Sequence, residues 1–346
     1  MYNHCSGIDW MCVDKNAEIP LPRSLYLEVT NRCNLKCRAC LQFRGMEEQP
    51  RDLSLREVKL IVDQIPILGR AVLHGIGEPL LNKELAEIIG YLKERKAYII
   101  FNSNAILLNS KWAEKLISSE LDELRVSLDA ATESTYKRVR GSDKFLQVVE
   151  NIETLLRMRK AAHSATPKVS VWLVATNANV KDLPETIRLA ARVGIDEVYL
   201  QRLVYPIDGP GYGLANKEKS ITDPSLRDVD ILKKSMALGK HLGVSLMASG
   251  LVSPHESLKK KSKSTAPWRQ CGRPRELAYI TARGNLLPCC IAPFATVDYS
   301  SVILGNVFEQ PLDQAWLGEK YQDFRRKQQS SNPPACCLGC GVEWSL

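Results

Sequence analysis

The first indication of chemistry in this chain comes from three cysteines, Cys33, Cys37 and Cys40, spaced C-x₃-C-x₂-C. They follow residues 24–30, a short run with β-strand character, so we expect them on a loop at the C-terminal end of a strand. Three soft thiolates on one loop can hold three irons of a four-iron cluster. The fourth iron then has no ligand from this loop, and an open metal position is where a substrate or cosubstrate binds. The alternative is a structural zinc site, although such sites usually show C-x₂-C pairs and four ligands.

Alternating strands and helices must position this loop. Apolar runs predict strands over 24–30, 70–74, 97–102, 123–128, 169–175 and 196–201. Helices are expected over 54–66, 82–95, 110–119, 144–160 and 182–193, with Ser54, Asn82 and Asp182 as caps. Such repeats imply a parallel sheet with right-handed crossovers, and a closed eight-unit barrel would need about 250 residues. We therefore predict an α/β fold, an open partial (β/α)6 barrel, with the site at the C-terminal strand ends.

Polar residues follow the second predicted strand. Gly75 and Gly77 leave room for a ligand to approach the backbone closely, and Glu78 supplies an acceptor for an ammonium group. His74 lies at the end of this strand, and the sequence leaves two roles open for it, packing in the core and catalysis.

The next two predicted strands also end in polar residues. Asn102 follows the third strand, where ordinary turn chemistry is the alternative explanation. Ser127 and Asp129 share one face of the fourth strand, because side chains alternate. In the basic segment that follows, we select Arg140 over Arg138 as a bidentate partner for a carboxylate. The alternative is that both arginines are surface charges.

Residues 30–40 resemble the cluster loop of the radical S-adenosylmethionine (SAM) superfamily. The resemblance implies that Cys33, Cys37 and Cys40 ligate a [4Fe–4S] cluster whose unique iron is chelated by SAM. It also implies that SAM is cleaved to a 5′-deoxyadenosyl radical, which abstracts hydrogen from the substrate. One departure is Ala39, at a position that is often aromatic in the family and packs the adenine.

The same resemblance assigns SAM contacts to the strand ends. Residues 76–79 are similar to the G-G-E-P motif that holds the methionyl amine, with Ile76 in place of the first glycine. Residues 101–104 are similar to a segment that faces the SAM ribose and carboxylate. The SAM-binding residues implied in this way are Gly77, Glu78, Asn102, Ser127, Asp129 and Arg140.

A second group of cysteines lies near the C-terminus. Cys271 and Cys289 flank a predicted hairpin, 276–281 with 285–288, and Cys337 and Cys340 form a C-x₂-C pair. Four such thiolates can close one site, and their chemistry permits either zinc or an iron–sulfur cluster.

This second pattern resembles the SPASM/twitch extension of radical SAM enzymes, in which a hairpin, a helix (here 312–326) and cysteines carry auxiliary clusters. The resemblance implies a second, auxiliary [4Fe–4S] cluster held by Cys271, Cys289, Cys337 and Cys340. We expect a single auxiliary cluster, because the chain ends six residues after Cys340. Cys290 and Cys336 remain as alternative ligands, buried thiols or hydrogen donors to a substrate radical.

Composition limits the class of protein. The 346 residues are 45% hydrophobic and 25% charged, which is typical of a soluble globular protein, and no apolar run reaches the roughly 20 residues of a membrane span. We expect a cytoplasmic enzyme whose eleven cysteines serve metals rather than disulfides, with Cys5 and Cys12 incidental. The expected organisation is a lead-in over 1–23, the barrel over 24–248 with a helix at 225–242 and a strand at 243–248, a linker over 249–270 and the auxiliary domain over 271–346.

The expected function is radical oxidation or epimerisation of a small polar metabolite of amino sugar or cyclitol type. Only about 24 residues precede the first predicted strand, too few for an independent peptide-binding domain. The alternative is modification of a peptide or protein side chain. The loop 202–225 is either a substrate-contacting lid or a surface loop. The expected electron donor is of flavodoxin or ferredoxin type.

A hypothesis from another class is a zinc-bound nucleic-acid-binding protein, motivated by the net charge of +8 and the lysine run at 259–263. We favour a solvated linker for this run, because no aromatic residues interleave the lysines.

Overall fold

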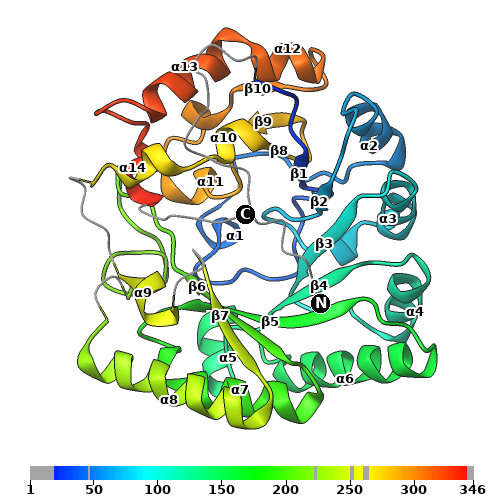
Figure 1. Ribbon diagram of the computed structural model, residues 1–346, viewed down its shortest axis with the longest axis vertical. Coiled ribbons are helices and arrows are strands. Elements are labelled where there is room, and N and C mark those ends of the chain that lie inside the picture. Colours follow the sequence, from blue (N-terminus) through cyan, green and yellow to red (C-terminus); the bar gives the residue numbers. More distant parts are fainter. Residues whose placement is uncertain (1–18, 46, 222–223, 250–252, 260–264, 341–346) are drawn as a thin grey trace.

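One curved sheet organises the described part of the chain. The computed structural model describes residues 19–45, 47–221, 224–249, 253–259 and 265–340. The sheet has ten strands in the order β10-β9-β8-β1-β2-β3-β4-β5-β6-β7. In Figure 1 the helices between the barrel strands lie along its outer side. The strands are β1 Ser24–Leu27, β2 Arg70–Val72, β3 Tyr98–Ser103, β4 Glu123–Ser127, β5 Lys168–Ala175, β6 Glu197–Arg202, β7 Ser245–Ala248, β8 Leu277–Ile280, β9 Asn285–Leu287 and β10 Gly305–Asn306.

Helices alternate with the strands of the barrel, and further helices follow β7. Those of the barrel are α1 Leu41–Arg44, α2 Leu55–Val62, α3 Leu85–Glu94, α4 Ser110–Ser118, α5 Glu133–Arg140, α6 Phe145–Ala161, α7 Leu183–Val193 and α8 Leu226–Leu242. The later ones are α9 Pro254–Leu258, α10 Arg273–Glu276, α11 Ala292–Ala295, α12 Leu312–Leu317, α13 Glu319–Gln328 and α14 Ala335–Cys340.

The predicted α/β partial barrel is confirmed, and the parallel part of the sheet extends past the six expected strands at both ends. Strands β1 to β6 follow the predicted order, and β7 pairs parallel with β6 instead of only leading to a linker. Ser54 caps α2 through a capping box with Glu57. Asn82 lies two residues before the N-cap of α3, which is Glu84. Its Nδ2 donates to the carbonyls of Val29 and Leu53, and its Oδ1 accepts from the Glu84 N–H.

Asp182 is the third predicted cap, and its side chain makes no capping bond to α7. Its carboxylate accepts a hydrogen bond from the hydroxyl of Thr135 in α5. Asp182 therefore stands at the predicted N-cap position of α7, and its side chain joins this helix to α5.

The auxiliary region continues the barrel sheet. Strand β8 pairs parallel with β1 from Ser24↔Leu277 to Leu27↔Ile280, so β1 is a central strand. The predicted hairpin is confirmed as the antiparallel pair β8–β9. The single helix predicted over 312–326 was wrong, because the backbone at Gly318 is extended (φ −63°, ψ 157°) and separates α12 from α13.

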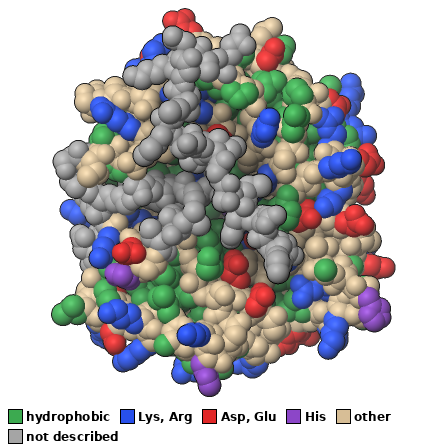
Figure 2. Space-filling view, in the orientation of Figure 1, with side chains coloured by type: hydrophobic (Ala, Val, Ile, Leu, Met, Phe, Trp, Pro, Cys, Tyr) green, Lys and Arg blue, Asp and Glu red, His purple; other side chains and the backbone are tan. Residues whose placement is uncertain are grey.

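Surface features bear on the broad class of the protein. Among the described residues no helix has both the length and the apolar character needed to cross a bilayer. On the face shown in Figure 2, lysines and arginines are interspersed with aspartates and glutamates. Cys5, Cys12 and most of the lysine run lie outside the described residues.

Leu27 tests the central position of β1. Its side chain is fully buried, so Leu27→Ala should lower the free energy of unfolding by about 2–5 kcal/mol. The control Leu226→Ala removes a side chain that is 91% exposed and should change it by less than about 0.5 kcal/mol. Urea denaturation followed by circular dichroism measures both, and equal midpoints would contradict the packing described.

Candidate functional site

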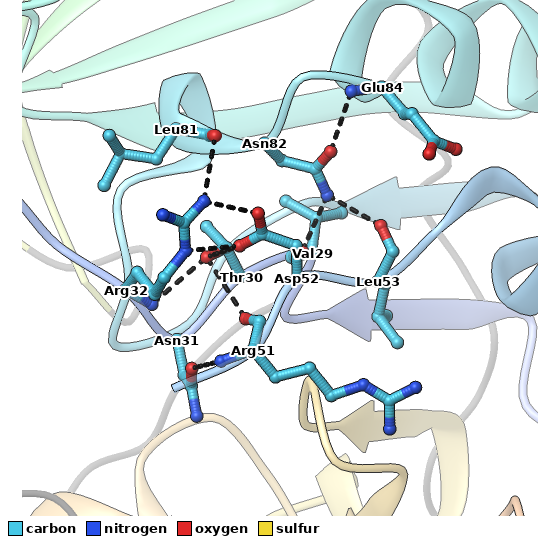
Figure 3. Close-up of polar contacts among 10 residues, drawn as sticks. All are labelled: Val29, Thr30, Asn31, Arg32, Arg51, Asp52, Leu53, Leu81, Asn82 and Glu84. Carbon is cyan, nitrogen blue, oxygen red and sulfur yellow. Dashed lines mark hydrogen bonds and ion pairs between the residues drawn. The ribbon is translucent and has the colours of Figure 1, made fainter. Parts of the chain in front are cut away.

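The cysteine loop is fastened where it leaves β1 (Figure 3). Thr30 Oγ1 donates to Asp52 Oδ1 at 2.6 Å, and Arg32 Nε donates to the same carboxylate oxygen at 2.8 Å. The backbone N–H of Arg51 donates to Asn31 Oδ1 at 2.7 Å. Asn82 adds its bonds to Val29 and Leu53, each 2.8 Å long. The loop therefore starts from a fixed position, set by side chains one to three residues before Cys33.

Gly77 lets a neighbouring segment pack directly on this loop. A Cβ atom at Gly77 would lie 2.0 Å from the carbonyl oxygen of Thr30 and 2.7 Å from that of Arg32. The next residue, Glu78, donates its N–H to the Arg32 carbonyl at 2.8 Å. The sequence predicted that the small size of Gly77 lets a ligand approach the backbone. In the structure, the segment from Thr30 to Arg32 makes that close approach.

Glu78 is buried and holds the end of β3. Its Oε1 accepts from Ser103 Oγ at 2.7 Å, and its Oε2 accepts from the Asn104 N–H at 2.7 Å. Asn104 in turn donates through Nδ2 to Asn34 Oδ1 at 2.7 Å, with Cys33 Sγ 3.9 Å away. A contact of Glu78 with the methionyl amine of SAM stays a prediction.

Sequence reasoning selected Asn102 in this segment and missed Ser103 and Asn104. Asn102 is half-buried, one residue before the buried Ser103. The signal that could have found the other two is their turn-forming residue types directly after a strand.

Asp129 and Arg140 form a buried ion pair. Arg140 Nη1 donates to Asp129 Oδ2 at 2.9 Å, and the Val174 N–H donates to Asp129 Oδ1 at 2.7 Å. The Arg140 Nε is buried and has no hydrogen-bond acceptor among the described residues. Arg138, the rejected candidate, donates instead to the Ala178 carbonyl at 2.8 Å.

Burial and the charge of Arg140 act on the pKa of all three thiols in the cysteine loop. Burial raises the pKa of Cys33 to about 11 and that of Cys40 to about 12, and it also raises the pKa of Cys37. The positive charge of Arg140 acts on all three thiols in the opposite direction, and the negative charge of Glu78 reaches Cys33 and Cys37. Without a metal these thiols keep their protons at neutral pH, so metal binding must displace them.

Comparison with known proteins places the chain in a family. The radical SAM superfamily model matches residues 27–190, and the SPASM iron–sulfur cluster-binding domain matches residues 271–341. The mycofactocin maturase MftC of Mycobacterium tuberculosis is 31% identical over 322 residues, covering 92% of this chain and 76% of that protein. The chain belongs to the radical SAM superfamily. It is a radical SAM enzyme with a [4Fe–4S] cluster that binds SAM and with a SPASM iron–sulfur region.

Other similarities agree with this membership. The PqqA peptide cyclase of Granulibacter bethesdensis is 23% identical over 325 residues, covering 93% of this chain and 81% of that protein. Among solved structures, Streptococcus suis SuiB bound to S-adenosylmethionine has a TM-score of 0.68 at 17% identity, over 88% of this chain and 68% of that one. The SuiB likeness supports the fold.

The donor set of this radical SAM enzyme fits the cluster and SAM. Three half-buried thiols lie close enough for their charges to interact, and a four-iron cluster gives each thiolate its own iron. Beside them the unpaired Nε of Arg140 is a buried donor suited to a carboxylate. Within the described residues, no three His, Cys, Asp or Glu side chains converge to hold a single metal ion.

The SPASM region gathers five of its six cysteines around one hollow of about 450 Å³. They are the four predicted ligands and one more: Cys271, Cys289, Cys337, Cys340 and Cys336. Cys290 instead receives a hydrogen bond from Arg273 Nη1 at 3.2 Å. Cys336 therefore lies among the predicted ligands. Cys290, the other cysteine outside the predicted ligand set, is hydrogen-bonded to the Arg273 guanidinium.

The interior face of the barrel carries further polar and aromatic residues. Ser127 ends β4 in register with Trp172, whose ring stacks on Tyr199 at 4.0 Å between centroids. The guanidinium of Arg125 lies 4.3 Å from the Trp172 ring centroid on β5. Burial and the charge of Arg125 lower the pKa of His74 to about 4, so His74 is neutral at physiological pH.

The loop after β6 connects the cysteine loop to the SPASM region. Leu214 donates its N–H to the Arg38 carbonyl at 2.7 Å, between Cys37 and Cys40. Asp208 accepts from the Val297 N–H at 2.9 Å, beyond α11. This segment, which the sequence left as a lid or a surface loop, is fastened at both places.

Glu28 is a buried carboxylate that sequence reasoning missed. Its Oε1 accepts from the Ile76 N–H at 2.6 Å, and its Oε2 accepts from the Ala282 N–H at 3.1 Å. It therefore joins β1 to the segment before Gly77 and to the β8–β9 turn. Burial raises the pKa of Glu28 to about 7. The available signal was an acidic residue inside an otherwise apolar strand.

Gly77→Ala tests the packing of this segment on the cysteine loop. The added Cβ overlaps the Thr30 carbonyl, so we expect a loss of about 1–3 kcal/mol in stability and less iron bound after anaerobic reconstitution. The control Gly90→Ala meets nothing within 4 Å and lies inside α3, where alanine should stabilise by up to about 1 kcal/mol. Full iron loading of Gly77→Ala would contradict the packing argument.

Glu28 should make stability depend on pH. A carboxyl whose pKa is raised by folding binds its proton more tightly in the folded state. Its contribution to stability is therefore complete below about pH 4.5 and is lost as the pH rises through about 7. The difference in unfolding free energy between the natural protein and Glu28→Gln should fall by about 3 kcal/mol across this window. Urea titrations at several pH values measure it, and a pH-independent difference would disprove the assignment.

Proposed function

We propose that this radical SAM enzyme modifies a side chain of a peptide or protein. The observation that supports the proposal most directly is the similarity to PqqA peptide cyclase, which extends over 93% of this chain. A solved SuiB structure of the same fold is bound to the precursor peptide SuiA, with a TM-score of 0.64 and 17% identity. That structure supports only the capacity of this fold to take a peptide.

The roles of individual residues are part of the proposal. Cys33, Cys37 and Cys40 hold the cluster, and Cys271, Cys289, Cys337 and Cys340 hold the auxiliary cluster. When bound, the cluster and SAM supply the one-electron chemistry that removes a hydrogen atom from the substrate. A flavodoxin or ferredoxin supplies the electron.

The chain's own residues position SAM. Arg140 directs its unpaired Nε to the SAM carboxylate, and Asp129 holds the guanidinium for this contact. Gly77 and Glu78 present the amine-binding segment, and Asn102 and Ser127 line the neighbouring strand ends. The loop after β6 closes one side of the site against water by its bonds to Arg38 and Val297.

The second candidate is the small polar metabolite that the sequence favoured. That expectation rested on the short segment before β1, and the relatives support the peptide alternative better. In this reading Cys290 and Cys336 are candidate hydrogen donors to a substrate radical.

Substrate-dependent cleavage of SAM distinguishes the two candidates. The reconstituted enzyme is incubated without oxygen with SAM, dithionite and size-fractionated cell extract, and 5′-deoxyadenosine is measured by mass spectrometry. We expect a stimulating fraction that loses its effect when it is digested with protease beforehand. A protease-resistant fraction of low mass would favour the metabolite instead.

The cluster cysteines provide the control for this assay. Replacing Cys33, Cys37 and Cys40 by alanine should abolish 5′-deoxyadenosine and remove about four irons per chain. Unchanged iron content in this variant would overturn the ligand assignment.

A further inference from the structure

Glu48, shortly after the cysteine loop, has one oxygen fixed and one oxygen free. Its Oε1 accepts three hydrogen bonds: from Tyr299 OH at 2.6 Å, from Asn285 Nδ2 at 2.7 Å and from Thr281 Oγ1 at 3.1 Å. All three donors belong to the SPASM region. The other oxygen, Oε2, is buried and has no partner among the described residues. Three donors on one oxygen thus fix where the second oxygen lies.

This carboxylate lines a hollow of about 270 Å³ beside the predicted cluster and SAM residues. Leu41, which follows Cys40, and Ile76, which precedes Gly77, line it from the barrel. Pro293 of α11 and Tyr299 line it from the SPASM region, and Figure 1 shows α1 and α11 near each other inside the ring of strands. Part of this space is open to solvent and the enclosed part is narrow, so the hollow admits at most the end of one side chain of a larger substrate.

Within the described ranges, no cationic side chain pairs with Glu48. Arg44 lines the same hollow, but its Nη2 donates to the Val297 carbonyl at 3.0 Å and to Glu47 at 3.2 Å. The negative charge of Glu48 contributes to the raised pKa of Glu28, so a second carboxylate lies near Glu48. A buried carboxylate oxygen without a donor is costly, and a charged donor would remove that cost.

We propose that Glu48 Oε2 is a substrate-binding subsite for a cationic N–H donor, the ammonium or guanidinium group of a basic side chain next to the residue that is modified. This inference rests on the proposed function, because it assigns a sequence preference to a peptide substrate. Glu48 would act by positioning the substrate, and its carboxylate is not part of the SAM-binding residues.

Binding of small probes tests the subsite without any turnover. The cluster-loaded protein with SAM is titrated by ligand-observed NMR with N-acetyl-lysine N-methylamide and with its neutral counterpart, N-acetyl-norleucine N-methylamide. We expect the lysine probe to bind at least tenfold more tightly. N-acetyl-arginine N-methylamide, used as a competitor, distinguishes ammonium from guanidinium recognition.

Two matched variants locate the effect. In Glu48→Gln the three donors retain the amide oxygen, and the amide NH₂ takes the place of Oε2, so lysine-probe binding should weaken at least tenfold. In Glu185→Gln an exposed carboxylate of α7, away from the residues that line the hollow, is changed, and binding should stay within twofold. Iron content and thermal midpoint are measured for both variants to confirm an intact fold.

The outcomes separate this proposal from the proposed function. Equal binding of the lysine and norleucine probes, no detectable binding of the lysine probe, or unchanged binding to Glu48→Gln would each overturn the subsite. Loss of binding in Glu48→Gln in a protein that no peptide stimulates would leave the subsite standing and reject the peptide substrate.

Discussion

A single buried carboxylate lies where the parts of this enzyme meet. Glu28, at the C-terminal end of β1, accepts one backbone N–H from the segment before Gly77 and another from the β8–β9 turn. Burying a carboxylate is expensive unless donors compensate it, and here the donors come from two parts of the chain more than 200 residues apart in sequence. The positions of the cysteine loop, the segment before Gly77 and the SPASM region all depend on this junction.

A second barrel carboxylate, Glu48, also bonds to the SPASM region. Glu48 takes three donors from the SPASM region on one oxygen, much as Glu28 takes backbone donors on two. Asp208, in the loop after β6, accepts from Val297 in that region. Acidic side chains of the barrel thus bond repeatedly to the SPASM region, so the two regions are joined at several separate points.

The local features of the fold were readable from the sequence, and the long-range ones were not. The strands and the β8–β9 hairpin followed from apolar runs and a Gly-containing turn. Helix α5 was missed because its basic residues dominated the interpretation of that segment. The break at Gly318 was missed because the apolar periodicity continues across it. The pairing of β8 with β1 has no local signal, since it joins residues about 250 positions apart.

The same distinction between local and long-range features applies to the candidate site. The spacing of Cys33, Cys37 and Cys40 and the acidic residue of the 76–79 motif stand out in the sequence itself. The partners of Glu78, Ser103 and Asn104, do not stand out in the sequence. They reach Glu78 because β3 ends beside it, and residue type alone does not reveal that position. Glu28 and Glu48 carry no motif, and only the three-dimensional structure reveals what surrounds their oxygens.

The position of β8 beside β1 has a consequence for biosynthesis. When the ribosome has completed β7, one edge of β1 is still without its neighbour, and it waits until residue 280 has left the exit tunnel. An apolar strand with an open edge is a template for pairing with other chains, and contacts of such long sequence separation form slowly. The nascent chain therefore spends most of its synthesis with the strand beneath its cysteine loop unprotected, and chaperones that shield such edges are natural partners at that stage.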